Sequence, residues 1–320
     1  MDLNFSPMIF KCEVGEYTKN AAGFAAKGEI MALVPFDKLQ GKIWIDGEVV
    51  DWSDARIHVL SHGLHYGSVV FEGERIYNGK IFQSRAHSER LVASAKMLGM
   101  GMPYDVDQIE QIKRETADIQ GLDDAYVRVV AWRGSEQMGI SAQATKTHMA
   151  CAIWAWPSYF AMEARLKGIK LQTSRWKRPS PDTIPCHAKA AGLYMICTLS
   201  KHEAEAQGYD DALMHDYRGY VAEATGANIF FQDGKKLHTP TPDCFLNGIT
   251  RQTVIKMAKD HGLEVVERHI KPDEIPDFEG CFITGSAAEV TPVSIIDEHQ
   301  FVVTDEIKTL LTGYDQLVRA

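Results

Sequence analysis

The sequence has no long apolar run, no close pair of cysteines and no excess of positive charge. In 320 residues, hydrophobic side chains make up 45% and charged side chains 24%, which is ordinary for a folded globular protein. No apolar stretch approaches the roughly 20 residues that a membrane helix needs. We therefore expect no membrane segment and one large or two medium domains.

Basic residues are too few for a protein that binds nucleic acid through its phosphates. The 34 Lys and Arg residues are outnumbered by 43 Asp and Glu residues, which gives a net charge of −9. The first twenty residues lack the basic and apolar segments of an export signal. We therefore expect a cytoplasmic protein with no nucleic-acid partner.

The cysteines and histidines lack the arrangements of metal or disulfide sites. The six cysteines include no C-x-x-C pair, so neither a zinc ribbon nor a disulfide framework is indicated. Four histidines (His58, His62, His65 and His187) form no predicted helix with an H-x-x-x-H pair and no triplet with a carboxylate. We predict reduced thiols and no catalytic metal, and we interpret Cys186 as a packing residue.

Periodicity and turn signals divide the chain into four segments. Residues 1–40 show little periodicity and are interpreted as an N-terminal extension. A small domain is predicted over 41–156, an interdomain linker over 157–167 around Pro157, and a large domain over 168–320. We find no internal repeat and no low-complexity tract.

Both domains are predicted to mix helices and strands. Asp46-Gly47 and Asn78-Gly79 are strong hairpin turns between strand-like residues. Helical spacing of apolar residues, or apolar runs bounded by turns, indicates the remaining elements. The predicted helices are 84–100, 106–121, 192–208 and 250–262, and the predicted strands lie in 43–50, 74–83, 125–132, 148–156, 169–176, 211–216, 220–232, 235–240 and 282–293.

Lys189 lies where an irregular, proline-rich stretch (178–185) gives way to a helix-compatible one. A lysine that forms a Schiff base needs its amine deprotonated near neutral pH, and burial or a neighbouring cation favours that form. On spacing alone, an ordinary surface lysine is the simpler interpretation.

Three later motifs have features of an anion or cofactor site. Glu223 stands in the apolar segment YVAEATGANIFF, where a carboxylate either pairs with a buried cation or belongs to a turn. Gly248, Ile249 and Thr250 are predicted to begin a helix, whose free amides favour an anion. The residues 286–288 offer successive amides after a strand, which suits phosphate or carboxylate. Each motif alone is a weak signal.

In their order along the chain, these motifs resemble the class IV (fold type IV) pyridoxal-phosphate enzymes, from about Lys42 to about Pro292. The stretches SHGLHYGSVVFEG (61–73), AYVR (125–128) and MGI (138–140) resemble the branched-chain aminotransferases of that family. The resemblance implies an α+β fold with a smaller N-terminal α/β domain, a larger C-terminal domain and the active site between them. It also implies pyridoxal 5'-phosphate and ping-pong transamination of leucine, isoleucine and valine with 2-oxoglutarate, giving 2-oxo acids and L-glutamate.

The resemblance also implies roles for individual residues. Lys189 matches the lysine that holds the cofactor and moves the proton, and Glu223 matches the glutamate that bonds its pyridine nitrogen. Tyr194 matches the tyrosine that bonds the ring hydroxyl. The residues that match the phosphate ligands are Arg85, Ile249, Thr250 and Ser286.

On the substrate side, Tyr126 and the amides of Ser286 and Ala287 match the group that binds the α-carboxylate. Arg128 matches the residue that accepts the distal carboxylate of glutamate. The residues implied to form an apolar pocket are Phe71, Gly73, Tyr126, Trp156 and Tyr194. Tyr66 and Ile140 are implied to come from a partner subunit, so a homodimer or higher homo-oligomer is expected.

Several residues depart from the family pattern, and other functions stay open. EATGAN replaces a more glycine-rich EGAGEN, Asn247 stands where proline is frequent, and Ser286 stands where threonine is usual. Glu74, where glycine is common, is expected to alter the pocket mouth. The alternatives are a D-amino-acid or (R)-amine transaminase, an aminodeoxychorismate-lyase-like enzyme, and a protein that carries the cofactor without turnover. The order of preference among branched-chain donors and the choice between dimer and hexamer are left open.

Overall fold

The structure, a computed structural model, describes residues 34–156 and 165–320. The chain divides into two units, residues 1–38 and 39–320. In the first unit the described residues include a short 3-10 helix, η1 (Phe36–Lys38). Most of the predicted extension and most of the predicted linker lie outside the described residues, so the domain boundaries stay predictions. No helix in the described part of the chain is long and apolar enough to cross a membrane.

The first sheet of the second unit contains the two predicted hairpins. Its strands follow the order β2-β1-β7-β6-β4-β5, and β3 pairs with β6. Asp46 and Asn78 have φ of 49° and 48°, and a glycine follows each of them, which is the backbone that these two-residue turns require. The strands are β1 (Lys42–Ile45), β2 (Glu48–Asp51), β3 (Val69–Phe71), β4 (Glu74–Tyr77), β5 (Lys80–Ile81), β6 (Ala125–Arg133) and β7 (Thr147–Ala155).

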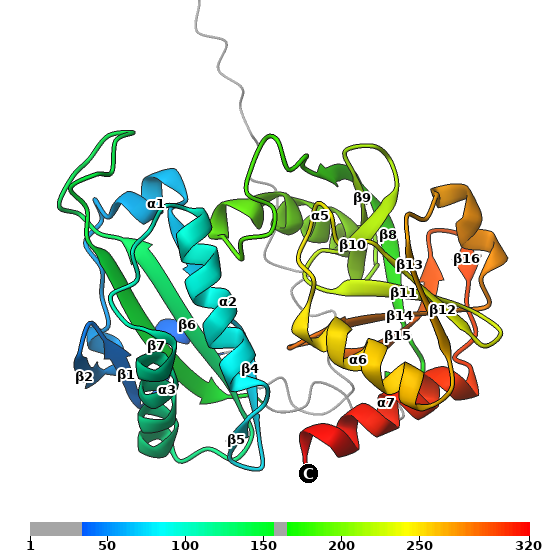
Figure 1. Cartoon of the computed structure of the whole chain (residues 1–320), viewed down its shortest axis with the longest axis horizontal. Helices are drawn as coiled ribbons and strands as arrows, with labels where there is room; N and C mark the ends of the chain where they lie inside the picture. Colours follow the sequence, from blue (N-terminus) through cyan, green and yellow to red (C-terminus); the bar gives the residue numbers. More distant parts are fainter. Residues whose placement is uncertain (1–33, 157–164) are drawn as a thin grey trace, which may run out of the picture. The chain divides into compact units, whose positions relative to one another are not determined.

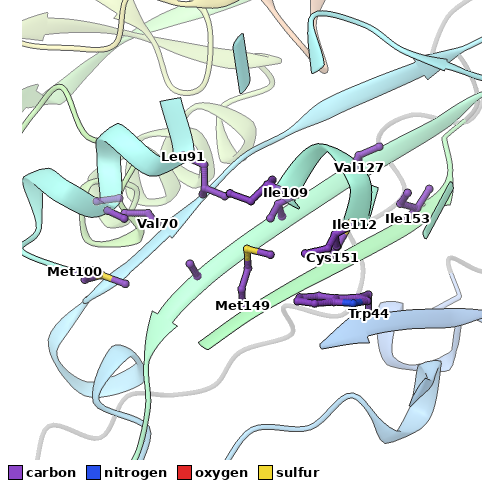
Figure 2. Packing of buried hydrophobic residues seen from close by; sticks show 14 of the residues in the cluster. Trp44, Val70, Leu91, Met100, Ile109, Ile112, Val127, Met149, Cys151 and Ile153 are labelled. Atoms are coloured by element: carbon purple, nitrogen blue, oxygen red, sulfur yellow. The ribbon is translucent and has the colours of Figure 1, made fainter. Parts of the chain in front are cut away.

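Two helices, α2 (Ser84–Met97) and α3 (Val106–Gln120), pack against this sheet (Figure 1). A capping box between Asp105 and Gln108 begins α3, and Gly121 in the left-handed conformation ends it. The core between the helices and the sheet is apolar (Figure 2). Its buried side chains include Leu91, Ile109, Val127, Met149, Cys151 and Ile153.

The second sheet is mixed, with strand order β10-β9-β8-β15-β14-β11-β12-β13, and β16 pairs with β15. The pairs β8–β9, β8–β15 and β12–β13 are parallel, and the other named pairs are antiparallel. The strands are β8 (Ile169–Arg178), β9 (Asp211–Asp216), β10 (Val221–Ala224), β11 (Asn228–Asp233), β12 (Lys236–Pro240), β13 (Glu264–Arg268), β14 (Gly280–Gly285), β15 (Glu289–Ile296) and β16 (His299–Gln300).

Both faces of the second sheet are buried. Phe230 and Phe231 are adjacent in β11 and belong to different apolar clusters, because successive side chains of a strand point to opposite faces. The helices of this half are η3 (Ala191–Leu193), α5 (Met195–Ala206), α6 (Ile249–Asp260), η4 (Pro272–Asp277) and α7 (Asp305–Val318). The fold is therefore α+β, as predicted.

Candidate functional site

Lys189 lies in the irregular connection between β8 and η3, and its backbone is fixed to the first sheet and to α2. Its amide donates to Ser94 Oγ at 3.0 Å, and its carbonyl accepts from the amide of Phe71 at 3.1 Å. The next residue, Ala190, bridges to Val70. The Lys189 Nζ donates to the Tyr194 hydroxyl at 2.8 Å. The lysine is thus a positioned amine rather than a mobile surface side chain.

Glu223 is buried in β10 beside a buried guanidinium. The distance between Arg178 Nε and Glu223 Oε1 is 3.2 Å, and Asn228 Nδ2 donates to Glu223 Oε2 at 3.2 Å. Burial raises the pKa of Glu223 to about 7, although the positive charges of Arg178 and Lys189 oppose that rise. The carboxylate can therefore be kept charged by a further positive group placed beside it.

A pocket connects Lys189 and Glu223 with the predicted anion-binding segments. Gly248 precedes α6, so the amides of Ile249 and Thr250 are at the start of a helix, where they favour an anion. Thr284 Oγ1 is buried and has no hydrogen-bond partner among the described residues. The pocket is lined by Arg90, Arg178, Lys189, Tyr194, Glu223, Thr225, Gly226, Ala227, Asn228, Leu246, Gly248, Ile249, Thr250, Thr284, Gly285 and Ser286. These donors and the buried carboxylate fit a phosphorylated cofactor with a basic ring nitrogen.

Arg85 does not line this pocket, and Arg90 does. The Arg85 side chain is 61% exposed, and it pairs with Asp107 at 2.8 Å and Glu89 at 3.3 Å. The two arginines are five positions apart in a helix, so they point about 140° apart around α2. The expectation for Arg85 is therefore corrected, and Arg90 takes its place as the candidate phosphate ligand. The spacing of Arg90 from His87 and Ser94 along one helix face is the signal that would have found it.

Glu72 fixes the guanidinium of Arg90, which lines the pocket. The Arg90 guanidinium donates to Glu72 at 2.7 and 2.8 Å, and His87 Nδ1 lies 2.6 Å from the same carboxylate. Burial by itself would raise the pKa of Glu72, but Arg90 and His87 outweigh it, so this pKa lies well below its usual range. Glu72 thus remains charged and fixes the fork of Arg90.

The residues expected to bind substrate form an aromatic group with one cation. Arg128 Cζ lies 4.6 Å from the centre of the Phe71 ring, and Lys189 Nζ lies 5.0 Å from the same ring. Arg128 Nη2 also donates to the Tyr126 hydroxyl at 3.3 Å. The ring pairs Phe71–Tyr194 and Tyr126–Trp156 each have centres 4.9 Å apart. A side chain at Gly73 would collide with the Tyr126 hydroxyl, so this glycine provides room for the ring.

Of the residues expected to bind substrate, Tyr194 and Ser286 line the pocket, and the others do not: Tyr66, Phe71, Gly73, Tyr126, Arg128, Ile140, Trp156 and Ala287. Ile140 is 86% exposed and Tyr66 is 42% exposed. Both are connected through His62, whose ring centre lies 4.5 Å from that of Tyr66 and whose Nε2 lies 3.0 Å from the Gly139 carbonyl. Tyr66 belongs to α1 (His62–Tyr66), a short helix that the sequence did not predict.

Glu74 does not face the pocket, contrary to expectation. Its carboxylate is buried in the core and accepts from Lys113 Nζ at 2.8 Å, with both side chains almost inaccessible. Because Gly73 faces Tyr126, the next residue of the extended chain points to the opposite side of the sheet. Asn247 likewise has a local role, since its side chain accepts from Arg251 at 2.9 Å.

One group of possible metal ligands occurs among the described residues. Asp216, Asp243 and Cys244 bring ligand atoms within 4.8 Å of one another. The guanidinium of Arg218 donates to both carboxylates, at 2.7 and 2.9 Å, so their charge already has a partner. This cluster carries no metal assignment, and the expected absence of a catalytic metal stays a prediction.

Comparison with known proteins places these features in context. Residues 69–296 match the family described as amino-transferase class IV. A probable branched-chain-amino-acid aminotransferase of Rickettsia conorii is 46% identical over 268 residues, which cover 83% of this chain and 91% of that protein. The crystal structure of the Escherichia coli branched-chain amino acid aminotransferase has a TM-score of 0.84 and 34% identity, over 88% of this chain and 95% of the other. An aminotransferase of Brucella abortus bound to the cofactor PLP has a TM-score of 0.79 and 29% identity, over 88% and 100%.

Proposed function

The chain belongs to the class IV aminotransferase family, and from that premise we propose that it uses pyridoxal 5'-phosphate to transfer the amino group of branched-chain L-amino acids to 2-oxoglutarate. The observation that carries the proposal is the proximity of a positioned lysine to an aromatic group that contains one cation. Lys189 Nζ and Arg128 lie over the same Phe71 ring. The lysine amine and the cation expected to bind substrate therefore lie beside the same aromatic ring.

The pocket residues have separate tasks in this proposal. When bound, the cofactor supplies an electron sink for the charge that develops at the substrate Cα. Lys189 would accept the proton that leaves the substrate Cα and hold it for return, with the Tyr194 hydroxyl keeping its Nζ in place. Glu223 stabilises a positive ring nitrogen. The phosphate would be held by Arg90, Ser286 and the amides of Ile249 and Thr250, all of which line the pocket.

The substrate would be oriented by its carboxylates. The Tyr126 hydroxyl and the amides of Ser286 and Ala287 bind the α-carboxylate, while Phe71, Trp156 and Tyr194 surround a branched side chain. Arg128 accepts the distal carboxylate of glutamate in the second half-reaction. Because its guanidinium lies over two rings, it presents an apolar face to leucine and its donor edge to glutamate.

A homodimer in the cytoplasm is part of this proposal. Exposed large apolar side chains are concentrated on α1 and the loops bonded to it: Ile57, Val59, Leu60, Leu64, Tyr66, Met138 and Ile140. His65 connects α1 to the Val59 carbonyl at 2.9 Å, and His62 connects it to Gly139. An apolar face of this kind favours a protein partner. A second copy of this chain would bring its own Tyr66 and Ile140 to the pocket mouth.

An assay of amino donors tests the proposal. The purified protein with pyridoxal 5'-phosphate should form 2-oxo acids from L-leucine, L-isoleucine and L-valine when 2-oxoglutarate is supplied. D-Alanine and (R)-amines should give no product. Conversion of D-alanine or an (R)-amine in preference to L-leucine would replace this function with that of a D-amino-acid or amine transaminase. Release of pyruvate from aminodeoxychorismate would indicate a lyase.

A further inference from the structure

Glu289 has a backbone conformation that a glutamate adopts only under constraint. Its φ is +52°, and it directly follows Ser286, Ala287 and Ala288 in the hairpin between β14 and β15, where Gly285 pairs with Glu289. A residue with positive φ next to a hairpin turn is usually glycine, because a Cβ makes positive φ costly. A side chain that persists there has to be held by its surroundings, which points to a role for it.

The Glu289 carboxylate is buried and contacts three side chains from other parts of the chain. Its side chain is 9% exposed. The Tyr77 hydroxyl donates to Oε1 at 2.8 Å, Arg75 Nη1 lies 3.7 Å from Oε1, and Arg165 Nη1 lies 3.1 Å from Oε2. Tyr77 and Arg75 belong to β4 of the first sheet, and Arg165 precedes β8 of the second. Glu289 therefore connects the two sheets at the residue after the turn.

The same contacts continue to the backbone at Trp156 and at Val290. Arg75 Nη2 donates to the carbonyl of Trp156 at 3.2 Å, and Arg165 Nη2 donates to the carbonyl of Val290 at 3.0 Å. The turn itself is closed by Thr291, whose hydroxyl donates to the carbonyl of Ala288 at 2.5 Å. A shift of the Glu289 carboxylate would therefore be transmitted to the turn amides and to Trp156 together.

We propose that Glu289 is a positioning residue, whose buried carboxylate fixes the amides of residues 286–288 in the orientation that binds the substrate carboxylate. The proposal rests on the proposed function in one respect, the use of this turn for that carboxylate. Glu289 does not line the pocket, so it acts through the turn. Its loss should weaken substrate binding more than it slows the chemical step.

Two substitutions distinguish the effect of the Glu289 carboxylate from the effect of its strained backbone. Glu289→Gln keeps the size of the side chain, and Glu289→Gly removes it but adopts positive φ without cost. Both should raise the KM for L-leucine and the Kd for 4-methylpentanoate, a carboxylate without an amine, by about tenfold, with kcat changed less than about threefold. Asp315→Asn is the matched control, because it removes a different carboxylate from Arg165 and leaves Glu289 in place. It should behave as the wild type.

Amide hydrogen exchange of the peptide that contains residues 286–288 gives a readout without cofactor or turnover. In the cofactor-free protein these amides should exchange faster in both Glu289 variants than in the wild type or Asp315→Asn. If Glu289→Gln and Glu289→Gly do not fold, Tyr77→Phe, which removes one hydrogen bond, should show a smaller change in the same direction. Unchanged exchange and unchanged Kd, or a fall in kcat at constant KM, would overturn the proposal. Wild-type failure to convert L-leucine, with the exchange and Kd differences intact, would reject the proposed function and leave this role standing.

Discussion

Glu223 and Arg178 are each costly to bury alone, and each is buried beside the other. Removing a charge from water costs several kcal/mol unless an opposite charge and hydrogen bonds replace the water. Here Arg178 and Asn228 contact the Glu223 carboxylate, yet burial still raises its pKa to about 7. The site therefore contains a carboxylate whose charge is only partly compensated until a positive ring nitrogen joins it.

Replacing Glu223 by glutamine should change how stability depends on pH in the cofactor-free protein. Because the pKa is raised in the folded state from its ordinary value of 4.5, the folded protein binds this proton more tightly than the unfolded chain. Wild-type stability should fall as pH rises from about 4.5 to about 7, by on the order of 3 kcal/mol, and Glu223→Gln should lack that component. Parallel pH profiles of the unfolding free energy in the two proteins would contradict this account.

The same variant should retain pyridoxal 5'-phosphate and slow the half-reaction with L-leucine by orders of magnitude, since a neutral amide does not stabilise a positive ring nitrogen. Stopped-flow absorbance under single-turnover conditions measures that rate. If Glu223→Gln reacted with L-leucine at the wild-type rate, Glu223 would have no role in the chemical step, although its effect on stability could still hold.

Replacing Arg128 should weaken the binding of glutamate but not that of leucine, so the two half-reactions should be affected differently. Arg128→Met keeps an apolar surface against Phe71 but loses the charge-assisted bonds to the distal carboxylate. Glutamate and 2-oxoglutarate should bind more weakly by about 2–3 kcal/mol, with leucine nearly unaffected. Tyr126→Phe is the control, because it removes a bond to the α-carboxylate that both substrates share. Equal losses for leucine and glutamate in Arg128→Met would mean that this arginine is structural.

At the scale of one helix, α2 determines which arginine reaches the pocket. Its residues His87, Leu91, Ser94 and Ala95 are buried, and Arg90 lies on the side toward Glu72, whereas Arg85 faces solvent. The motif resemblance identified an arginine in this helix but not the helix phase. The position of each arginine around the helix axis therefore determines which one reaches the pocket, and the order of residues in the motif does not reveal it.

Arg90→Ala should therefore weaken the binding of pyridoxal 5'-phosphate by about 100-fold, the effect of losing a charge-assisted pair of roughly 2–3 kcal/mol. Arg85→Ala should leave it unchanged, because among the described residues the side chain pairs with the exposed carboxylates of Glu89 and Asp107. Equilibrium dialysis of the cofactor-free proteins gives both constants. The reverse ranking would restore Arg85 to the site.

The elements that the sequence predicted are those with strong local signals. Both hairpin turns and the long periodic stretches of α2, α3, α5 and α6 are formed. The helix α7 was not predicted, although Thr304 caps it and Ile307, Leu310, Leu311 and Tyr314 repeat at helical spacing. The strand β13 offers less signal, because it is short and its partner β12 is reached only through the crossover helix α6.

At the scale of the whole molecule, long-range pairing assembles the site. Strand β8 pairs with β15, far away in the sequence, and Lys189 is fixed by Ser94 and Phe71 from the other half of the chain. Such pairings depend on the packing of both sheets and leave no local pattern in the chain. The motifs predicted which segments matter for the site, and the tertiary fold determines which side chains meet.

Leu64→Glu tests the proposed homodimer. Leu64 is 60% exposed on α1, so a charge there should not unfold the chain but should disfavour an apolar interface. We expect a monomer by light scattering and a large loss of activity with L-leucine, because Tyr66 and Ile140 of a second copy would be missing. Leu317→Glu, at an exposed leucine of α7, is the matched control. A dimeric and fully active Leu64→Glu protein would place the interface elsewhere.

The central claim is that Lys189 and bound pyridoxal 5'-phosphate act together on branched-chain L-amino acids. The most direct test is the absorbance spectrum of the cofactor-loaded protein during titration with L-leucine, in the wild type and in Lys189→Ala. In the wild type, L-leucine should convert the cofactor spectrum and 2-oxoglutarate should restore it, whereas Lys189→Ala should bind the cofactor without that cycle. The account would be contradicted if the wild-type spectrum did not change with L-leucine but changed with D-alanine. It would also be contradicted if Lys189→Ala converted the cofactor and restored it at the wild-type rate.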